Sequence, residues 1–254
     1  MIQRISSQVS YYGFARNIQN SFAGMYSSLE KLSSGFSINS AKDGPASLII
    51  SEQFRSQISS LNQQIENTSM LIGKYNTASS SLMEARSQLT ELRSLAVGAS
   101  NEGVNDEAML GAYDTSADAI VDTYNTFIST SEYNGQPLFD GSEFALADLS
   151  GIEGVDLSSA ESAQATIETI DAKIAELDSA MVDIGATQKN DLEAQLNSMR
   201  IRRENLTAAE SVIRSTDYVS EFSNFLAHQI RAKASIAMLA HFNASQEMML
   251  SIFD

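Results

Sequence analysis

The chain has 254 residues, of which 43% are apolar, with 13 Gly, 2 Pro and no Cys. This apolar fraction excludes a chain that is disordered by composition, the lack of Cys excludes a disulfide framework or a thiolate metal site, and the scarcity of Gly and Pro favours long helices. A net charge of −16 argues against nucleic acid and anionic membranes as partners, and no apolar run approaches the ~20 residues that a membrane span needs.

The first predicted helix carries a narrow apolar stripe. Its members alternate spacings of four and three residues: Ile18, Phe22, Met25, Leu29, Leu32 and Phe36. A stripe this narrow is typical of a coiled-coil seam, so it predicts packing against another helix. Gly35 interrupts the pattern, and residues 39–45 are typical of a turn in which Pro45 suits the first turn of the next helix.

A second, much longer helix is predicted for residues 46–99. A heptad pattern runs from Phe54 to Ala96 with one drift near Ala85. At 1.5 Å per residue such a helix is roughly 80 Å long, which indicates a rod and excludes a compact globule. A third helix is expected over 106–131, with these side chains facing inward: Met109, Tyr113, Ala117, Ile120, Tyr124 and Phe127 or Ile128.

Residues 133–137 are a strong turn signal because they contain Asn-Gly followed by Pro. The Gly-rich, acidic residues 138–157 are expected to form short strands or a hairpin. A last helical block begins near Ser159 with 3-4 spacing, which changes to 3-4-4 through Ile184, Gln188 and Leu192. That is a stutter, which locally unwinds a left-handed supercoil. The final amphipathic segment starts at Tyr218 and carries Phe222, Phe225, Leu226 and Ile230.

Together these patterns predict a mainly α protein, an elongated antiparallel helical rod of long heptad helices with a small β-hairpin region and paired terminal helices. Residues 1–42 with 215–254 form the terminal coiled-coil region, 43–137 with 160–214 the rod, and 138–159 a short acidic hairpin or loop. The stripe of the first helix is expected to face that of the last one. Between residues 101 and 160 there are twelve Asp or Glu and no Lys or Arg, so the middle of the chain is expected to be solvated.

No constellation of residues predicts catalysis or a cofactor. Asp114, Asp118 and Asp122 lie four apart, but calcium loops place carboxylates two apart, so a solvated helix face is the preferred interpretation over a metal site. His228 and His241 match no catalytic or metal motif and are interpreted as surface or interface residues. The apolar C-terminal helix lacks the basic polar face of a membrane-surface helix, so a helix seam is preferred.

Four segments resemble bacterial flagellins, in family order. Residues 32–43 resemble the N-terminal signature, residues 205–221 the C-terminal signature, residues 133–135 the turn before the central region, and residues 183–188 a further family segment. The matching signature residues are Ser33, Ser34, Gly35, Asn39, Ser40, Asp43, Asn205, Leu206, Asp217 and Tyr218. Gly44 and Pro45 depart from the family pattern, as does the extreme C-terminus, so the terminal seam is expected to pack somewhat differently from the best-known members.

The resemblance implies a structural subunit of the extracellular flagellar filament, used for swimming and not an enzyme. It implies export through a type III channel without a cleaved signal, with an export chaperone, a filament cap and hook-junction proteins as partners. The terminal helices would line an inner tube and polymerise through these residues: Ile18, Phe22, Met25, Leu29, Leu32, Phe36, Phe222, Phe225, Leu226 and Ile230. Only residues 138–163 occupy the place of the family's outer domains, so an acidic segment would form the outside face.

The resemblance also implies a site read by a vertebrate Toll-like receptor, here carrying Glu91, Arg93 and Leu95. Glu91 stands where the family motif has Arg, which predicts weak receptor activation. Three alternatives stay open: a hook–filament junction protein of the same family, a signalling coiled coil, and a secreted effector. Assembly of the purified protein into tubes, and its copy number per filament, would separate them.

Overall fold

The computed structural model describes residues 2–103, 105–142 and 145–250. They divide into two compact units, a terminal unit within residues 1–60 and 203–254 and a central unit within 61–202. Both boundaries fall inside helices, α2 (Pro45–Ala99) and α5 (Glu193–Arg214). The mainly helical fold with a small two-stranded hairpin confirms the predicted class. The three-part division into terminal region, rod and acidic loop stays a prediction.

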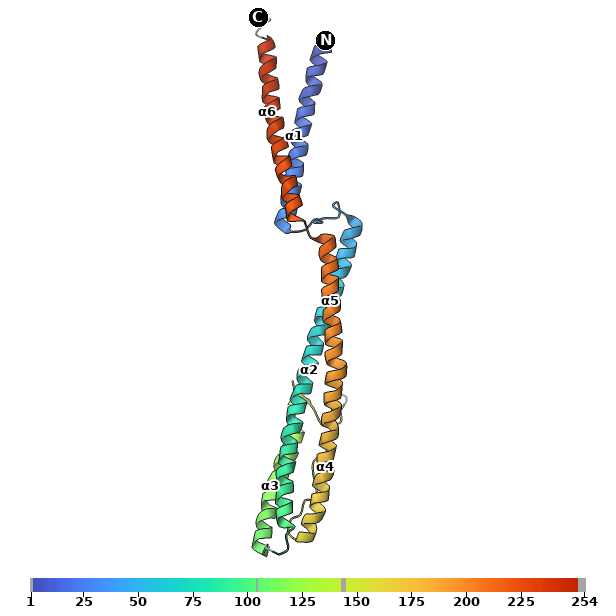
Figure 1. Cartoon of the computed structure of the whole chain (residues 1–254), viewed down its shortest axis with the longest axis vertical. Coiled ribbons are helices and arrows are strands. Elements are labelled where there is room, and N and C mark those ends of the chain that lie inside the picture. Colours follow the sequence, from blue (N-terminus) through green and yellow to red (C-terminus); the bar gives the residue numbers. More distant parts are fainter. Residues whose placement is uncertain (1, 104, 143–144, 251–254) are drawn as a thin grey trace. The chain divides into compact units, whose positions relative to one another are not determined.

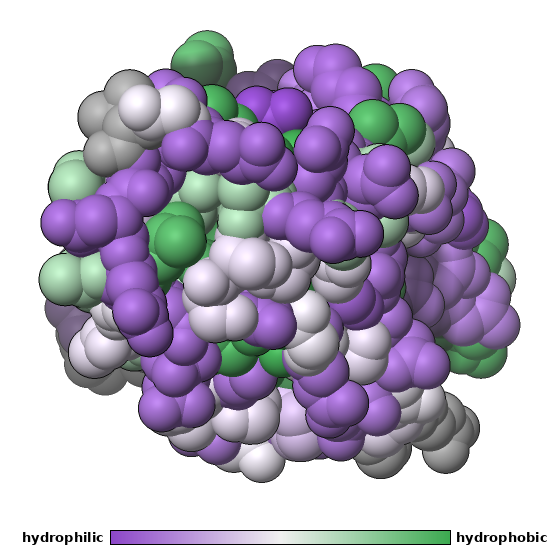
Figure 2. All heavy atoms as spheres, turned by 90° about the horizontal axis from the view of Figure 1, so that it is seen from below, coloured by the Kyte–Doolittle hydropathy of each residue, from purple (hydrophilic) through white to green (hydrophobic). Residues whose placement is uncertain are grey.

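The central unit is a helical bundle built around the heptad face of α2. Figure 1 shows α3 (Glu107–Thr130) and α4 (Ala160–Ala186) beside α2. Leu82, Leu89 and Leu92 of α2 are fully buried against residues such as Tyr124 and Ile170. The seven-residue interval from Leu82 to Leu89 keeps these side chains on one side of the helix, which explains why the sequence pattern locates this core. The end of the structure seen in Figure 2 is covered mainly by hydrophilic residues, with apolar ones in scattered spots.

Two helix starts are fixed by side-chain caps. The Asp106 carboxylate accepts a hydrogen bond of 2.7 Å from the backbone N–H of Met109, at the start of α3. At the start of α4, Ser159 and Ser162 cap each other's backbone N–H groups. Met109 itself is 42% exposed, so its predicted inward position is wrong. Leu110, seven residues before Ala117, lies on the buried face instead, and Met109 is rotated away from it by about 100°.

The predicted turn at Asn134-Gly135 is confirmed. Both residues have positive φ, 53° and 75°, as a tight hairpin turn requires, and they join β1 (Glu132–Tyr133) to β2 (Gln136–Pro137). Of the predicted short strands or hairpin within 138–157, the described residues form no regular strand but do hold one isolated antiparallel bridge, Asp140 to Asp148. This segment is also less solvated than predicted, because it buries Leu138, Phe139, Leu149, Ile152 and Leu157 in the core.

Side chains of α3 pair with part of the backbone of this segment, at Ile152 and Leu157. The Asn125 amide accepts from Ile152 N–H at 2.8 Å and donates to Ile152 C=O at 3.1 Å. The Asp114 carboxylate accepts from Leu157 N–H at 2.9 Å. Since buried backbone groups must be paired, these two helix residues make an irregular buried segment possible.

The predicted stutter lies in a π-helical segment, η1 (Thr187–Leu192). There the N–H of Glu193 donates to the carbonyl of Gln188, five residues earlier. Ile184 and Leu192 are both buried. In a regular α-helix, two residues that are eight apart, as Ile184 and Leu192 are, point about 80° away from each other. A π turn contains more residues than an α turn, so it reduces this angle and keeps both side chains on the core side.

The terminal unit pairs α1 (Ile2–Ser34) with α6 (Tyr218–Leu250). Figure 1 shows the two helices running side by side. Contacts at both ends of the pair fix an antiparallel register: the rings of Phe14 and Phe242 are 6.0 Å apart, and Lys31 Nζ is 3.9 Å from a Glu221 carboxylate oxygen. Within the described residues, no helix is long and apolar enough to cross a membrane.

Candidate functional site

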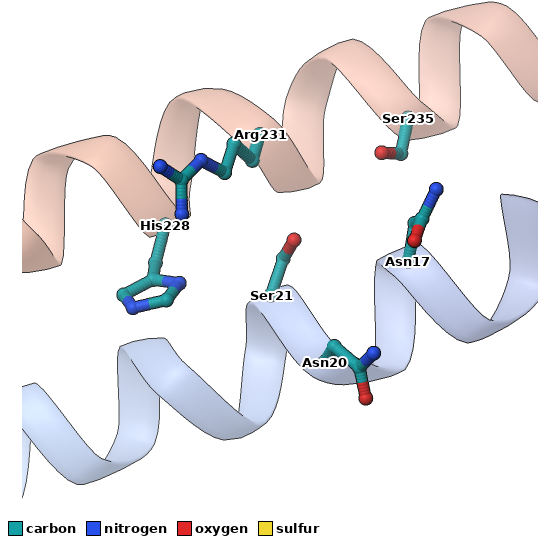
Figure 3. Close-up of a pocket in the computed structure, with 6 residues that line it drawn as sticks. All are labelled: Asn17, Asn20, Ser21, His228, Arg231 and Ser235. Carbon is teal, nitrogen blue, oxygen red and sulfur yellow. The ribbon is translucent and has the colours of Figure 1, made fainter.

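Small and polar side chains line the most deeply buried part of the contact between α1 and α6 (Figure 3), and half-buried members of the predicted apolar stripe lie beside them. Ser21 and Ser28 of α1 and Ala232 of α6 are 6%, 2% and 4% exposed. Between the two serines, Gly24 lies beneath the imidazole ring of His228, where any β-carbon would overlap the ring. Small residues let two helix backbones approach closely. Here the missing side chain of Gly24 leaves room for the ring of His228. His228 is thus an interface residue, as predicted, and His241 is exposed, as the surface interpretation expects.

The predicted polymerisation residues are therefore largely open to solvent in the single chain. Phe22, Leu29 and Phe36 of the N-terminal stripe are exposed, as are Phe222, Leu226 and Ile230 of the C-terminal one. The remaining members are half-buried: Ile18, Met25, Leu32 and Phe225. The expectation that the two stripes face each other within one chain is therefore met only in part.

Helix geometry explains this difference. One residue corresponds to about 100° of rotation, and the apolar stripe of α1 is displaced by about that angle from the face that carries Ser21, Gly24 and Ser28. Both sets of residues have heptad spacing, so α1 has two neighbouring seams. The seam of small residues contacts α6, and the apolar seam is half-buried at Ile18, Met25 and Leu32 and exposed at Phe22, Leu29 and Phe36.

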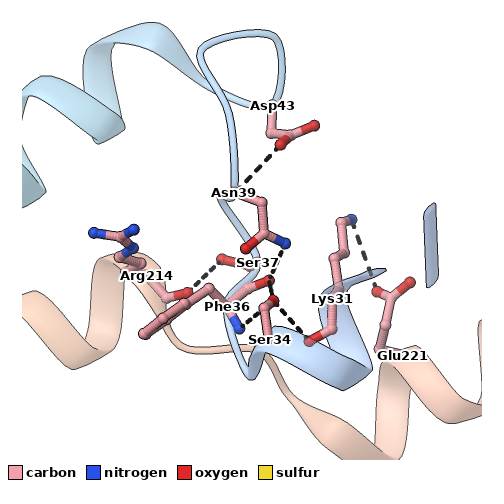
Figure 4. A network of polar contacts seen from close by, with 8 residues as sticks. All are labelled: Lys31, Ser34, Phe36, Ser37, Asn39, Asp43, Arg214 and Glu221. Carbon is pink, nitrogen blue, oxygen red and sulfur yellow. Dashed lines mark hydrogen bonds and ion pairs between the residues drawn. The ribbon is translucent and has the colours of Figure 1, made fainter. Parts of the chain in front are cut away.

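A second cluster joins the ends of α1 and α5 within the terminal unit (Figure 4). Gly35 has φ of 75°, which turns the chain sharply after α1. Phe36 and Ser215 then form an antiparallel bridge, with Ser37 N–H donating to the carbonyl of Arg214 at 2.7 Å and Thr216 N–H to the carbonyl of Gly35 at 3.0 Å. The Arg214 guanidinium lies over the Phe36 ring, 4.5 Å from its centre.

The signature residues after Gly35 hold this turn. The Asp43 carboxylate accepts from the Ser40 hydroxyl and the Ser40 N–H, both at 2.9 Å, and from the Asn39 N–H at 3.2 Å. These bonds, led by that from the Ser40 side chain, lower the pKa of Asp43. The Asn39 amide donates to the carbonyl of Phe36 at 3.2 Å, and the Ser34 hydroxyl accepts from Phe36 N–H at 3.2 Å.

The C-terminal signature contributes to the same cluster. Asp217 caps α6 by accepting from the N–H groups of Val219 and Ser220. The Tyr218 hydroxyl lies against Gly35. Ser33 and Asn205 are exposed, and Leu206 is half-buried, so these three stand outside the network.

Charged residues connect α2 and α5 close to this cluster. Arg214 donates to Glu52 at 3.0 Å, Arg55 donates to the same carboxylate oxygen at 2.9 Å, and the buried Ser51 hydroxyl donates to Glu210 at 3.2 Å. The hydrogen bond from Arg55 is the main cause that lowers the pKa of Glu52. The sequence pattern did not single out the pairs Arg214–Glu52 and Ser51–Glu210, because their partners lie far apart in the chain.

The candidate receptor-facing residues lie on α2 in the central unit. Glu91 is exposed and Leu95 is half-buried. Arg93 forms a two-bond ion pair with Asp171 of α4, with Nε–Oδ1 at 2.6 Å and Nη2–Oδ2 at 3.1 Å. The hydrogen bond from Arg93 is the main cause that lowers the pKa of Asp171.

Candidate metal ligands do not converge in the part of the chain that the structure describes. Of the three aspartates four residues apart, Asp114 is half-buried and bonded to the backbone of Leu157, while Asp118 and Asp122 are exposed. The small-residue seam was missed by sequence reasoning. Ser21 and Ser28 are seven residues apart, as the members of a helix seam are, but a search for apolar residues at this spacing does not find them.

Comparison with known proteins finds one family. Residues 5–143 match the family model described as bacterial flagellin N-terminal helical region, and residues 167–253 match that described as bacterial flagellin C-terminal helical region. The flagellin of Halalkalibacterium halodurans is 33% identical, over 88% of this chain and 90% of its own length. The flagellin of Bacillus subtilis is 29% identical, over 98% of this chain and 99% of its own length. A flagellar filament 30.7 kDa core protein of Treponema maltophilum is 28% identical, over 88% and 90%.

Proposed function

The chain belongs to the bacterial flagellin family, and on that premise we propose that α1 and α6 carry the surface through which its copies polymerise. As a family member it is a structural subunit of the flagellar filament, and swimming motility follows from that role. The family is one of structural proteins, and we propose that this chain catalyses no reaction.

The exposed apolar side chains of the terminal unit support this proposal. Leu29 is 50% exposed, Phe222 53% and Ile230 65%. A pair of helices that contact each other through small residues leaves these side chains in water. Burying a large apolar side chain stabilises by about 1.5–3 kcal/mol, so several such residues on each copy provide a strong drive toward association.

The family resemblance also suggests which other flagellar proteins this chain meets. We propose that the chain is exported outside the cell through a type III apparatus with an export chaperone. At the filament it would meet a cap and hook-junction proteins. The described parts of residues 138–159 would form the outer face in place of larger domains, with their acidic groups outward and their apolar groups in the core.

Seeded assembly tests the proposal. Purified full-length chain added to short filament fragments is expected to lengthen them, as seen by electron microscopy. A chain that lacks residues 1–40 is expected to remain helical and soluble and to add nothing to the fragments. Normal growth of the truncated chain would show that polymerisation uses another surface.

Copy number separates the filament subunit from the junction protein of the same family. A filament subunit is present in large excess over the other proteins of the purified flagellum. A junction protein forms a single short zone. Quantitative mass spectrometry of purified flagella measures this ratio directly.

A further inference from the structure

Arg214 joins the end of α5 to two other segments of the terminal unit. Its carbonyl accepts from the N–H and the hydroxyl of Ser37, at 2.7 and 3.1 Å (Figure 4). Its guanidinium lies 4.5 Å from the centre of the Phe36 ring and donates from Nη1 to Glu52 of α2 at 3.0 Å. The side chain is 13% exposed, so most of it is removed from water. One arginine therefore connects α5, the chain after α1 and the first part of α2.

The position of this guanidinium leaves one of its donors unpaired. The Nε–H of Arg214 is buried and has no hydrogen-bond partner in the parts of the chain that the structure describes. The Glu52 oxygen that accepts from Arg214 also accepts from Arg55 at 2.9 Å, so two cations share one carboxylate oxygen. Buried donors are normally paired, and an unpaired one destabilises the conformation that contains it. A competing carboxylate can therefore displace Arg214 from this position.

Such a carboxylate lies one helical turn away, at Glu210 of α5. Residues four apart on a helix are neighbours, and Glu before Arg is the favourable order for an ion pair. Among the described residues Glu210 is half-buried, forms no ion pair, and accepts from the neutral Ser51 hydroxyl at 3.2 Å. Arg214 thus has two carboxylates close to it, Glu52 on a different helix and Glu210 on its own.

We propose that Arg214 is a two-position latch that alternates between Glu52 of α2 and Glu210 of α5. When it binds Glu52, its guanidinium covers the Phe36 ring and holds the bridge between Phe36 and Ser215. When it binds Glu210, it leaves the ring, and the bridge opens more readily.

The latch controls how freely the pair of α1 and α6 moves against the ends of α2 and α5. Lys31 and Glu221 join α1 to α6 at 3.9 Å without involving Arg214, so the pair stays together when the latch opens (Figure 4). This role rests on the proposed polymerisation through these two helices, because a joint with two positions lets them adjust when copies associate. Association then favours whichever position the neighbouring copies bind better.

Hydrogen exchange of the full-length chain tests the latch, in solution and, where filaments form, in the filament. The amides to follow are those of Ser37 and Thr216, which donate across the bridge. Glu52→Gln removes the charge of the observed partner and is expected to speed their exchange about threefold or more. Glu210→Gln removes the charge of the competing partner but keeps an acceptor for Ser51. It is expected to slow their exchange about threefold, because the open position loses its ion pair.

The slowing must depend on Arg214. In an Arg214→Gln background there is no cation to move, so adding Glu210→Gln is expected to change the exchange by less than about twofold. Exchange within α5 is expected to be unchanged in each variant, which separates the latch from a general loss of stability. If Arg214 has one fixed position, Glu210→Gln leaves the bridge amides unchanged or speeds their exchange, since it weakens the bond to Ser51.

The contrary outcomes are distinct. The latch is overturned if Glu210→Gln fails to slow exchange, if it slows exchange without Arg214, or if the bridge amides are unprotected in both states of the chain. None of these results depends on filament growth. If the exchange results are as expected but the wild-type chain adds nothing to filament fragments, the latch stands and the proposed function fails.

Discussion

The imidazole ring of His228 on α6 lies against the backbone of Gly24 on α1, in the space that a β-carbon would occupy. The two helices therefore meet at a position where a residue without a side chain accommodates a ring. This contact lies between the two buried serines of α1 and is central to the small-residue seam.

Gly24→Ala is expected to weaken the pairing of α1 with α6, because the new methyl group overlaps the His228 ring. Gly13→Ala is the matched control on the same helix, since a β-carbon there meets nothing within 4 Å. Alanine favours a helix over glycine by about 1 kcal/mol, so the control is expected to be neutral or stabilising. The measurement is the temperature at which filaments dissociate. Equal temperatures for the two variants would contradict the contact.

Gly35→Ala is expected to destabilise the turn after α1 by two effects. Its φ of 75° costs a non-glycine residue about 1–2 kcal/mol, and a β-carbon there would lie 2.9 Å from the Tyr218 hydroxyl oxygen. Gly135→Ala, with the same φ and open space around it, isolates the first effect. The double variant Gly35→Ala/Tyr218→Phe lacks the hydroxyl that the new β-carbon would meet. Its melting temperature is expected to be higher than that of Gly35→Ala alone, by the part of the loss that the contact with the hydroxyl causes. If both variants melt at the same temperature, the whole destabilisation comes from the backbone conformation at position 35.

Asp171→Asn is expected to lower the melting temperature of the chain at neutral pH and to lose its effect in acid. Because Arg93 lowers the pKa of Asp171, the contribution of this carboxylate is present above its unfolded pKa and is lost as the pH falls through the folded value. The difference in melting temperature between wild type and variant should therefore shrink below about pH 4. Asp118→Asn, at an exposed aspartate of α3, is the control. A difference that is constant from pH 7 to pH 3 would exclude this ion pair as the cause.

Leu29→Asp is expected to abolish seeded growth while the monomer melts as the wild type does. Leu29 is 50% exposed in the single chain, so the carboxylate remains hydrated there and becomes unfavourable only when a second copy covers it. Ser27→Asp provides the control, because Ser27 is exposed and lies on the opposite side of α1. If both variants elongate filaments equally, the apolar stripe of α1 lies outside the subunit contact.

If a vertebrate Toll-like receptor reads this part of α2, as the family resemblance implies, Glu91→Arg is expected to strengthen its activation. Glu91 is exposed, and an arginine there can form two parallel charge-assisted hydrogen bonds, which are worth on the order of a hundredfold in affinity. Helix stability should not change, because both residues are good helix formers. Reporter cells exposed to equal amounts of wild type and variant provide the measurement. Equal, strong responses would remove Glu91 from the recognition site.

The sequence by itself determined the features that depend on neighbours along the chain. The heptad pattern of residues 54–96 located the core face of α2, the Asn134-Gly135 pair located the tight turn, and the change of spacing after Ile184 located the π segment. Each is set by backbone geometry within a few residues, so a local pattern is sufficient.

Tertiary structure decided the features that depend on distant partners. Residues 138–157 resemble strands in spacing, but Asn125 and Asp114 of α3 pair with their backbone and the apolar side chains enter the helical core. On α1, the small-residue face and the apolar face both have heptad spacing, so periodicity alone cannot select the one that meets α6. That choice depends on how closely the two backbones approach. Gly24 beneath His228 permits the close approach, and Phe22 and Leu29 remain exposed.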